Sequence, residues 1–331
     1  MSGRTLSAGA LILLGALLAG CAGTRGDQAA GAGSAPREPG AGSSGSAVLR
    51  TSLAVPAESR EIPVRIGYPV RGKDLRVVLF SHGAFSSRDD YDPILDPWAA
   101  AGYVVIAPTH RDSTTLGGRR GAGDPRHFGW RLDDMERLLA DLEVLLDRVP
   151  GLRARARLDR IAATGHSFGG LVAQTIAGGT YFDPASGRTV SRRDARIVAA
   201  LVFSGAGPFP PSLRDTDFAA IRVPLLVSVG TNDLRQAPDL SGYEWRRRPF
   251  DLAPADGSKY LLVLDGADHY LGGRVGRDDL PRDPRSDEYL AAFRRVSLRF
   301  LAAYVRDDAA ALRALRAATA AAAGVAALSA K

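Results

Sequence analysis

Short apolar runs recur along the chain from about residue 48, and glycine, proline, asparagine or aspartate residues bound most of them. Short runs with such boundaries are typical of strands that are buried on both faces of a sheet. We therefore expect strands at two β-rich segments and at six apolar runs: residues 48–55, 61–69, 76–81, 103–107, 160–164, 197–203, 223–229 and 260–264.

Helical patterns alternate with these runs. One helix is predicted over residues 132–149, where four leucines share a face, and another over residues 286–305. This alternation predicts the α/β class, with a mainly parallel sheet that helices cover on both faces. Ligands bind at the carboxyl ends of the strands in such sheets, so the residues that follow each run are the candidates for chemistry.

The first twenty residues have the anatomy of an export signal. Arg4 precedes an apolar run over residues 8–19, which is too short to cross a bilayer as a stable helix. The run ends in the sequence LAGC, which resembles the bacterial lipobox, and the alternative is an ordinary secretory signal with a chance cysteine. The resemblance implies lipidation of Cys21, which is the only cysteine in the chain. It also implies a membrane-anchored lipoprotein of the cell envelope, on the periplasmic side, in the outer membrane where the cell has one.

Composition then divides the chain into four segments. Residues 1–20 form the signal, and residues 21–47 are mostly alanine, glycine, serine and proline with a few charges, which predicts a flexible tether. Residues 48–305 form the folded domain. Residues 306–331 form an alanine-rich tail, for which we expect a frayed helix.

The overall composition is that of a globular protein, with 45% hydrophobic and 24% charged residues. The net charge is +7, but nearly all of the basic residues are arginines in short clusters, without a long basic stripe or interleaved aromatic residues. The pattern therefore argues against a nucleic-acid partner. No His, Asp or Glu cluster shows the spacing of metal ligands, so we expect no metal site.

The run at residues 160–164 leads directly into the sequence GHSFGG at residues 165–170, and a helical pattern follows over residues 171–177. This is a Gly-x-Ser-x-Gly motif between a strand and a helix. A serine on such a tight turn needs glycine neighbours so that the chain can approach itself closely. The motif predicts that Ser167 is a nucleophile.

An acid and a histidine should follow such a serine in chain order, each at a strand end. Asp233 follows the run at residues 223–229, and His269 follows the run at residues 260–264. His269 is the only histidine after Ser167, and Asp265 and Asp268 lie too close to it in sequence for easy pairing. We therefore predict a triad of Ser167, Asp233 and His269, with His269 as the base.

Two backbone amides are candidates for an oxyanion hole, those of Phe168 and of Ala84 in the sequence SHGAF. We expect His82 to brace this loop, His166 to pack beside the turn, His110 to have a structural role and His127 to lie in a surface loop. Candidate aromatic residues of the substrate pocket are Phe85, Trp130 and Tyr270, each of which could instead be ordinary packing.

With these residues the chain resembles the α/β-hydrolase superfamily over residues 48–305. The sequences SHGAF, GHSFGG and GADH look most like the branch with platelet-activating factor acetylhydrolases, chlorophyllase, predicted dienelactone hydrolases and cutinase-like polyester hydrolases. The resemblance implies hydrolysis of carboxylic esters through an acyl-serine intermediate, without a cofactor. The branch is not uniform, since true dienelactone hydrolases use a cysteine where this chain has Ser167.

Two other functions remain open at this point. A non-catalytic envelope lipoprotein could use the fold for binding, because a fold alone does not determine a function. An acyltransferase on the same scaffold would differ from an esterase only in the nucleophile that accepts the acyl group.

Overall fold

The computed structural model describes residues 45–120, 124, 126–184, 186–234, 243–319 and 324–331. The predicted signal, Cys21 and nearly all of the predicted tether lie outside these residues. Within them, no helix is long and apolar enough to span a membrane.

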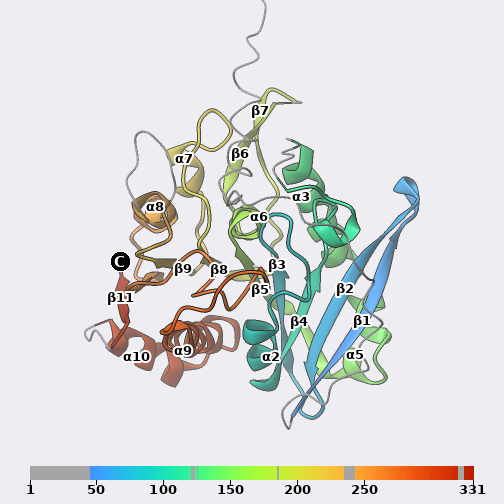
Figure 1. Ribbon diagram of the computed structural model, residues 1–331. Coiled ribbons are helices and arrows are strands. Elements are labelled where there is room, and N and C mark those ends of the chain that lie inside the picture. The colour runs from blue at the N-terminus through green and yellow to red at the C-terminus, as the bar shows by residue number, and fades with distance from the viewer. Residues whose placement is uncertain (1–44, 121–123, 125, 185, 235–242, 320–323) are drawn as a thin grey trace, which may run out of the picture.

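A nine-stranded sheet forms the centre of the molecule, in the order β1-β2-β4-β3-β5-β8-β9-β10-β11 (Figure 1). The six strands from β4 to β10 run parallel, whereas β1, β2 and β11 pair antiparallel at the two edges. The strands are β1 (Ser46–Val55), β2 (Arg60–Pro69), β3 (Leu75–Ser81), β4 (Tyr103–Pro108), β5 (Ala156–His166), β8 (Ile197–Phe203), β9 (Leu225–Gly230), β10 (Lys259–Leu264) and β11 (Ala326–Ala330). The predicted fold class is confirmed.

Helices cover both faces of this sheet (Figure 1). The helices are α2 (Asp92–Ala100), α3 (Arg126–Ala140), α4 (Leu142–Asp147), α5 (Leu152–Arg155), α6 (Phe168–Ile176), α7 (Asp215–Phe218), α8 (Glu244–Leu252), α9 (Ser286–Val305) and α10 (Ala309–Ala318). A short hairpin, β6 (Thr180–Asp183) with β7 (Arg188–Ser191), was not predicted and stands apart from the main sheet.

The hydrophobic core has two layers, because alternate residues of a strand point to opposite faces. On β3, Val77 and Leu79 join the layer under α3, α4 and α6, while Val78 and Phe80 join the layer under α2 and α9. All four side chains are fully buried. This two-sided burial explains why the central strands appear in the sequence as continuous apolar runs.

Two predicted elements differ in the structure. The single helix predicted over residues 132–149 begins earlier and is divided into α3 and α4, because the backbone of Asp141 leaves the helical region, with φ −106° and ψ 21°. The tail at residues 306–331 holds α10 and also β11, which pairs with β10. The tail therefore packs as part of the sheet rather than as a frayed helix.

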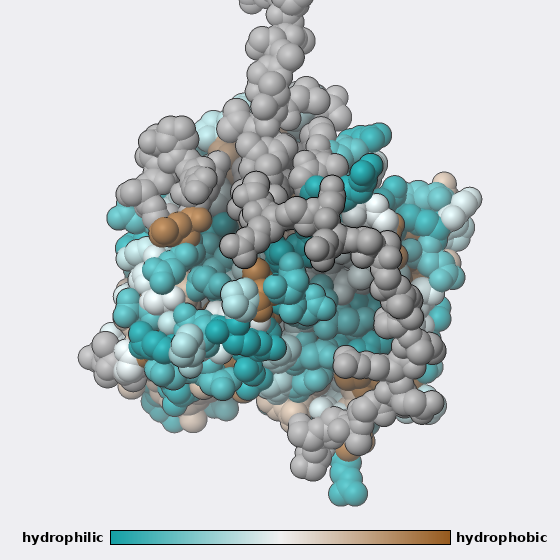
Figure 2. Space-filling view, viewed as in Figure 1, coloured by the Kyte–Doolittle hydropathy of each residue, from teal (hydrophilic) through white to brown (hydrophobic). Residues whose placement is uncertain are grey.

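The face of the molecule seen in Figure 2 is mostly hydrophilic over the described residues, with small and separate apolar spots. The large apolar side chains that are most exposed in the described part are equally scattered: Val70, Leu116, Val144 and Leu234. Scattered exposure of this kind is ordinary for a globular domain.

Candidate active site

Ser167 lies on the tight turn between β5 and α6. Its backbone has φ 53° and ψ −117°, a region that residues with a side chain rarely adopt. A Cβ atom at Gly165 would lie 2.2 Å from the carbonyl oxygen of Gly169, and one at Gly169 would lie 2.0 Å from that of Ser81. Both glycines of the motif are therefore required for the chain to pass this closely, as the sequence indicated.

His269 and Asp233 lie together after neighbouring strands. His269 Nδ1 is 2.9 Å from Asp233 Oδ1, and the Asp233 side chain is almost completely buried. The two other acids near His269 are engaged elsewhere: Asp268 accepts the amides of Tyr270 and Gly272, and Asp265 accepts the Thr231 hydroxyl. Of the three carboxylates considered from the sequence, Asp233 is the one that pairs with His269.

Arg246 of α8 also contacts Asp233, with its Nε 2.6 Å from the same Oδ1. Burial by itself would raise the pKa of Asp233, but the charges of Arg246 and His269 outweigh it and hold that pKa well below its ordinary value. Asp233 is therefore ionised at neutral pH. Arg246 was not predicted for the site, because nothing in the sequence distinguishes it from the other arginines of its cluster.

A small pocket brings Ser167 and His269 to one surface. Its other lining residues come from the loop after β3, the turn after β5 and the loop after β10: Gly83, Ala84, Ser86, Tyr91, His166, Tyr270 and Gly276. Of the predicted pocket aromatics, Tyr270 lies here. Phe85 and Trp130 are not among the described lining residues, because Phe85 is 2% exposed within the core and Trp130 packs between Arg111 and Arg126.

The two predicted oxyanion donors border this site. Ala84 lines the pocket, and Phe168 is the first residue of α6, where helix amides have no partner within the helix. In the loop, the amides of Gly83 and Phe85 donate to Tyr91 Oη and to Asp112, and the amide of Ser86 donates to the Gly83 carbonyl. No acceptor among the described residues takes the amide of Ala84.

His166 connects the loop after β3 with His269. Its Nε2 lies 2.9 Å from the carbonyl oxygen of His269, which only an N–H can satisfy, so Nδ1 accepts the Tyr91 hydroxyl at 2.8 Å. Burial and the nearby His269 hold the pKa of His166 well below its ordinary value, so the ring is neutral. The Tyr91 oxygen in turn accepts the amide of Gly83 at 2.9 Å.

A second Ser-His-Asp arrangement lies beneath the site. Ser81 Oγ is 3.0 Å from His110 Nε2, and His110 Nδ1 is 2.9 Å from Asp134 Oδ2. All three side chains are fully buried. Substrate cannot reach a hydroxyl in the core, so this chain of hydrogen bonds ties β3 and β4 to α3 and has a structural role.

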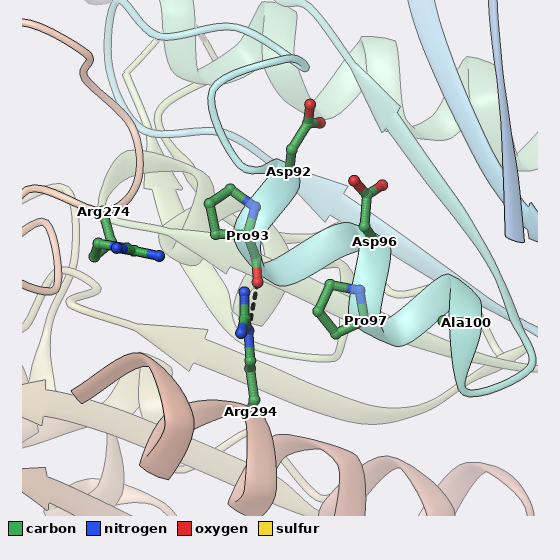
Figure 3. Close-up of a pocket in the computed structure, with 7 residues that line it drawn as sticks. All are labelled: Asp92, Pro93, Asp96, Pro97, Ala100, Arg274 and Arg294. Atoms are coloured by element: carbon green, nitrogen blue, oxygen red, sulfur yellow. Dashed lines mark hydrogen bonds between the residues drawn. The ribbon is translucent and has the colours of Figure 1, made fainter. Parts of the chain in front are cut away.

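A larger pocket lies elsewhere, between α2 and α9. Figure 3 shows the carboxylates of Asp92 and Asp96 on one side of α2 and Arg294 of α9 on the other side, where its Nε donates to the carbonyl of Pro93. The two carboxylates pair with Arg65 of β2, which is fully buried. None of the residues predicted for chemistry lines this pocket.

Comparison with known proteins places the chain in a family. A family model described as "Alpha/beta hydrolase family" matches residues 78–328, from β3 to β11. No curated protein is significantly similar to the chain. Because the match covers well over half of the chain and agrees with the mostly parallel sheet, the protein belongs to the alpha/beta hydrolase family, a membership that supports a hydrolase activity.

Proposed function

We propose that the protein is a serine hydrolase that cleaves carboxylic esters through an acyl-serine intermediate. The observation that carries this proposal is the arrangement of Ser167 on its strained turn in one small pocket with His269, which pairs with the buried Asp233 at 2.9 Å. The resemblance of SHGAF, GHSFGG and GADH to an esterase branch supports the ester as the bond that is cleaved.

The proposed reaction begins when Ser167 Oγ attacks the ester carbonyl carbon. His269 Nε2 takes the hydroxyl proton, while Asp233 holds Nδ1 protonated and stabilises the imidazolium. The amides of Ala84 and Phe168 stabilise the oxyanion. The bond to the alcohol then breaks, and the alcohol leaves with the proton from His269. Water repeats the sequence on the acyl-serine and releases the acid.

The test is labelling with a fluorophosphonate probe, followed by peptide mapping and a series of p-nitrophenyl esters from acetate to palmitate. We expect the label on Ser167, and we expect Ser167→Ala and His269→Ala to lose turnover by about 10³-fold or more. Asp233→Asn should lower turnover by nearly as large a factor. Ser81→Ala is the matched control, because Ser81 belongs to the buried Ser-His-Asp arrangement and its loss should leave labelling and turnover in place.

Other outcomes lead to other functions. A folded protein with neither label nor turnover contradicts the proposal and favours a non-catalytic binding protein. Transfer of the acyl group to an added alcohol, faster than to water, identifies an acyltransferase. Loss of labelling in Ser81→Ala with retention in Ser167→Ala would overturn the assignment of the nucleophile.

We further propose that the protein is anchored to a membrane of the cell envelope through lipidated Cys21. The LAGC sequence at the end of the apolar run supports this, and a tether that ends before β1, over residues 22–45, would allow the domain to stand about 25–30 Å away from the anchor. Incorporation of labelled palmitate that is lost in Cys21→Ala would support the anchor. Equal release of both forms into the soluble fraction would contradict it.

A further inference from the structure

We infer that the buried Arg131 is a positioning residue of the oxyanion hole. It bonds to the carbonyl of Gly83 and thereby orients the amide of Ala84 toward the site. This inference rests on the proposed function and adds to it a residue that touches no reacting atom. Arg131 lies on α3 and is 1% exposed, so its charge acts only inside the protein.

The peptide between Gly83 and Ala84 links the two residues, because it carries the carbonyl of one and the amide of the other. In a trans peptide the C=O and N–H bonds point in opposite directions, so whatever fixes the carbonyl also fixes the direction of the amide. Arg131 Nη2 donates to the Gly83 oxygen at 3.1 Å, and His82 Nδ1 donates to the same oxygen at 2.7 Å. Together with the amide of Ser86 at 3.3 Å, these two side-chain donors hold the carbonyl on one side and so direct the Ala84 N–H to the other side, where Ala84 lines the pocket with Ser167.

The amide of Ala84 is available to a substrate. The amides of Gly83, Phe85 and Ser86 each donate to an acceptor in the protein, while no described residue accepts from the amide of Ala84. A cation that bonds to the carbonyl also draws electron density along the peptide, which makes the N–H a stronger donor to a developing negative charge. The charge of Arg131 would thus be felt at the oxyanion without direct contact.

Asp112 fixes Arg131 in this position. Its two carboxylate oxygens accept Nε at 2.9 Å and Nη2 at 2.7 Å, and Oδ2 also accepts the amide of Phe85 at 3.1 Å. Arg131 further donates to the carbonyl of His82 and lies 4.6 Å over the ring of Phe168, the second predicted donor. One buried ion pair therefore contacts the residues on both sides of the oxyanion hole.

The test compares an ester with its thionoester, in which sulfur replaces the carbonyl oxygen. Sulfur is larger and accepts hydrogen bonds weakly, so a thionoester gains little from an oxyanion hole. Damage to the oxyanion hole slows the ester more than the thionoester, whereas loss of folded enzyme or of the base slows both together. The ratio of the two kcat values thus reports alignment of the hole, with active sites counted by fluorophosphonate titration.

We expect Arg131→Lys to lower kcat for the ester by about 10- to 100-fold with little change in KM, and to lower the ester-to-thionoester ratio by a similar factor. Lysine keeps the charge, but its single ammonium group cannot donate to Gly83, His82 and Asp112 together as the planar guanidinium does. The double variant Arg131→Met with Asp112→Asn removes both charges at similar volume and should lower the ratio as much or more. Arg65→Lys is the matched control, because Arg65 is equally buried and paired with aspartates but belongs to the α2 side of the sheet.

A folded Arg131→Lys variant with unchanged kcat and an unchanged ester-to-thionoester ratio would overturn the inference. The proposed function would survive that result, because it depends on wild-type turnover and on labelling of Ser167. An equal fall of the ratio in Arg65→Lys would overturn the inference too, since the ratio would then respond to the loss of any buried arginine and not to the contact with Gly83 in particular. If the wild-type protein hydrolyses no ester, the proposed function fails, and the inference fails with it.

Discussion

Arg246 lies closer to the Asp233 carboxylate than His269 does, at 2.6 Å against 2.9 Å from the same oxygen. The guanidinium and the imidazole thus approach the same carboxylate oxygen. Arg246 also donates to the carbonyl of Ser204 at 2.7 Å, which ties Asp233 to the end of β8. Arg246 therefore orients the acid but also places a positive charge beside the imidazole.

We expect Arg246→Gln to move the acid limb of the kcat/KM profile to higher pH. A neighbouring cation disfavours a protonated imidazole, so its removal stabilises the imidazolium and the base is lost at a higher pH than in the wild type. The measurement is kcat/KM between pH 4.5 and 9. Arg247→Gln is the control, because Arg247 pairs with Asp251 on the outer side of α8. An acid limb that stays in place, or that moves to lower pH, would contradict the prediction.

At the scale of elements, β11 completes one edge of the sheet. It pairs with β10 over five residues, and the side chains of Ala326 and Leu328 are buried against the layer that contains α9 and α10. Without this strand, β10 would present an unpaired edge, which favours association between chains. The tail is therefore part of the fold that positions His269, since His269 follows β10.

We expect Leu328→Ala to lower the free energy of unfolding by about 2–3 kcal/mol, because a buried leucine is lost and a cavity remains. Ser329→Ala, on the exposed side of the same strand, should change it by less than about 0.5 kcal/mol. Urea unfolding checks both. Equal stability of the two variants would show that β11 contributes little.

A chain ending at residue 319 should aggregate more readily than the full chain, as light scattering would show.

Across the whole molecule, three histidines lie fully buried below and beside the site: His82, His110 and His166. Burial is the largest cause that holds their pKa values below the ordinary range, with Arg131 adding to it for His82 and His110. The folded protein therefore keeps these rings neutral in a pH range where the unfolded chain binds protons to them. This links stability to pH.

We expect the free energy of unfolding to be constant above about pH 7 and to fall as the pH drops below about 6.5, the pKa of histidine in an unfolded chain. In that window each of the three rings contributes a slope of up to about 1.4 kcal/mol per pH unit. Carboxylates with lowered pKa values, such as Asp112, act only at more acidic pH and do not mask the effect. Urea midpoints at pH 8, 7, 6 and 5.5 test this. Equal midpoints would contradict it.

The sequence by itself determined the features that depend on local spacing. Apolar runs gave the central strands to within a few residues, since strands buried on both faces need continuous apolar side chains. The glycines around Ser167 predicted the turn, because a Cβ at Gly165 or Gly169 would clash with the backbone. The order of Ser167, Asp233 and His269 at strand ends predicted which groups meet, because parallel strands bring their carboxyl ends to one edge.

Only the tertiary structure decided the contacts between elements that lie far apart in the chain. Arg131 and Asp112 are separated by 19 residues and Arg246 by 13 residues from Asp233, and no local pattern distinguishes these charges from the many other arginines and aspartates. The exclusion of Ser81, His110 and Asp134 from chemistry depends on their burial, and the strand at β11 depends on an edge of β10 that only the assembled sheet offers. Ion pairs and sheet edges are properties of packing, and they therefore appear once the chain has folded.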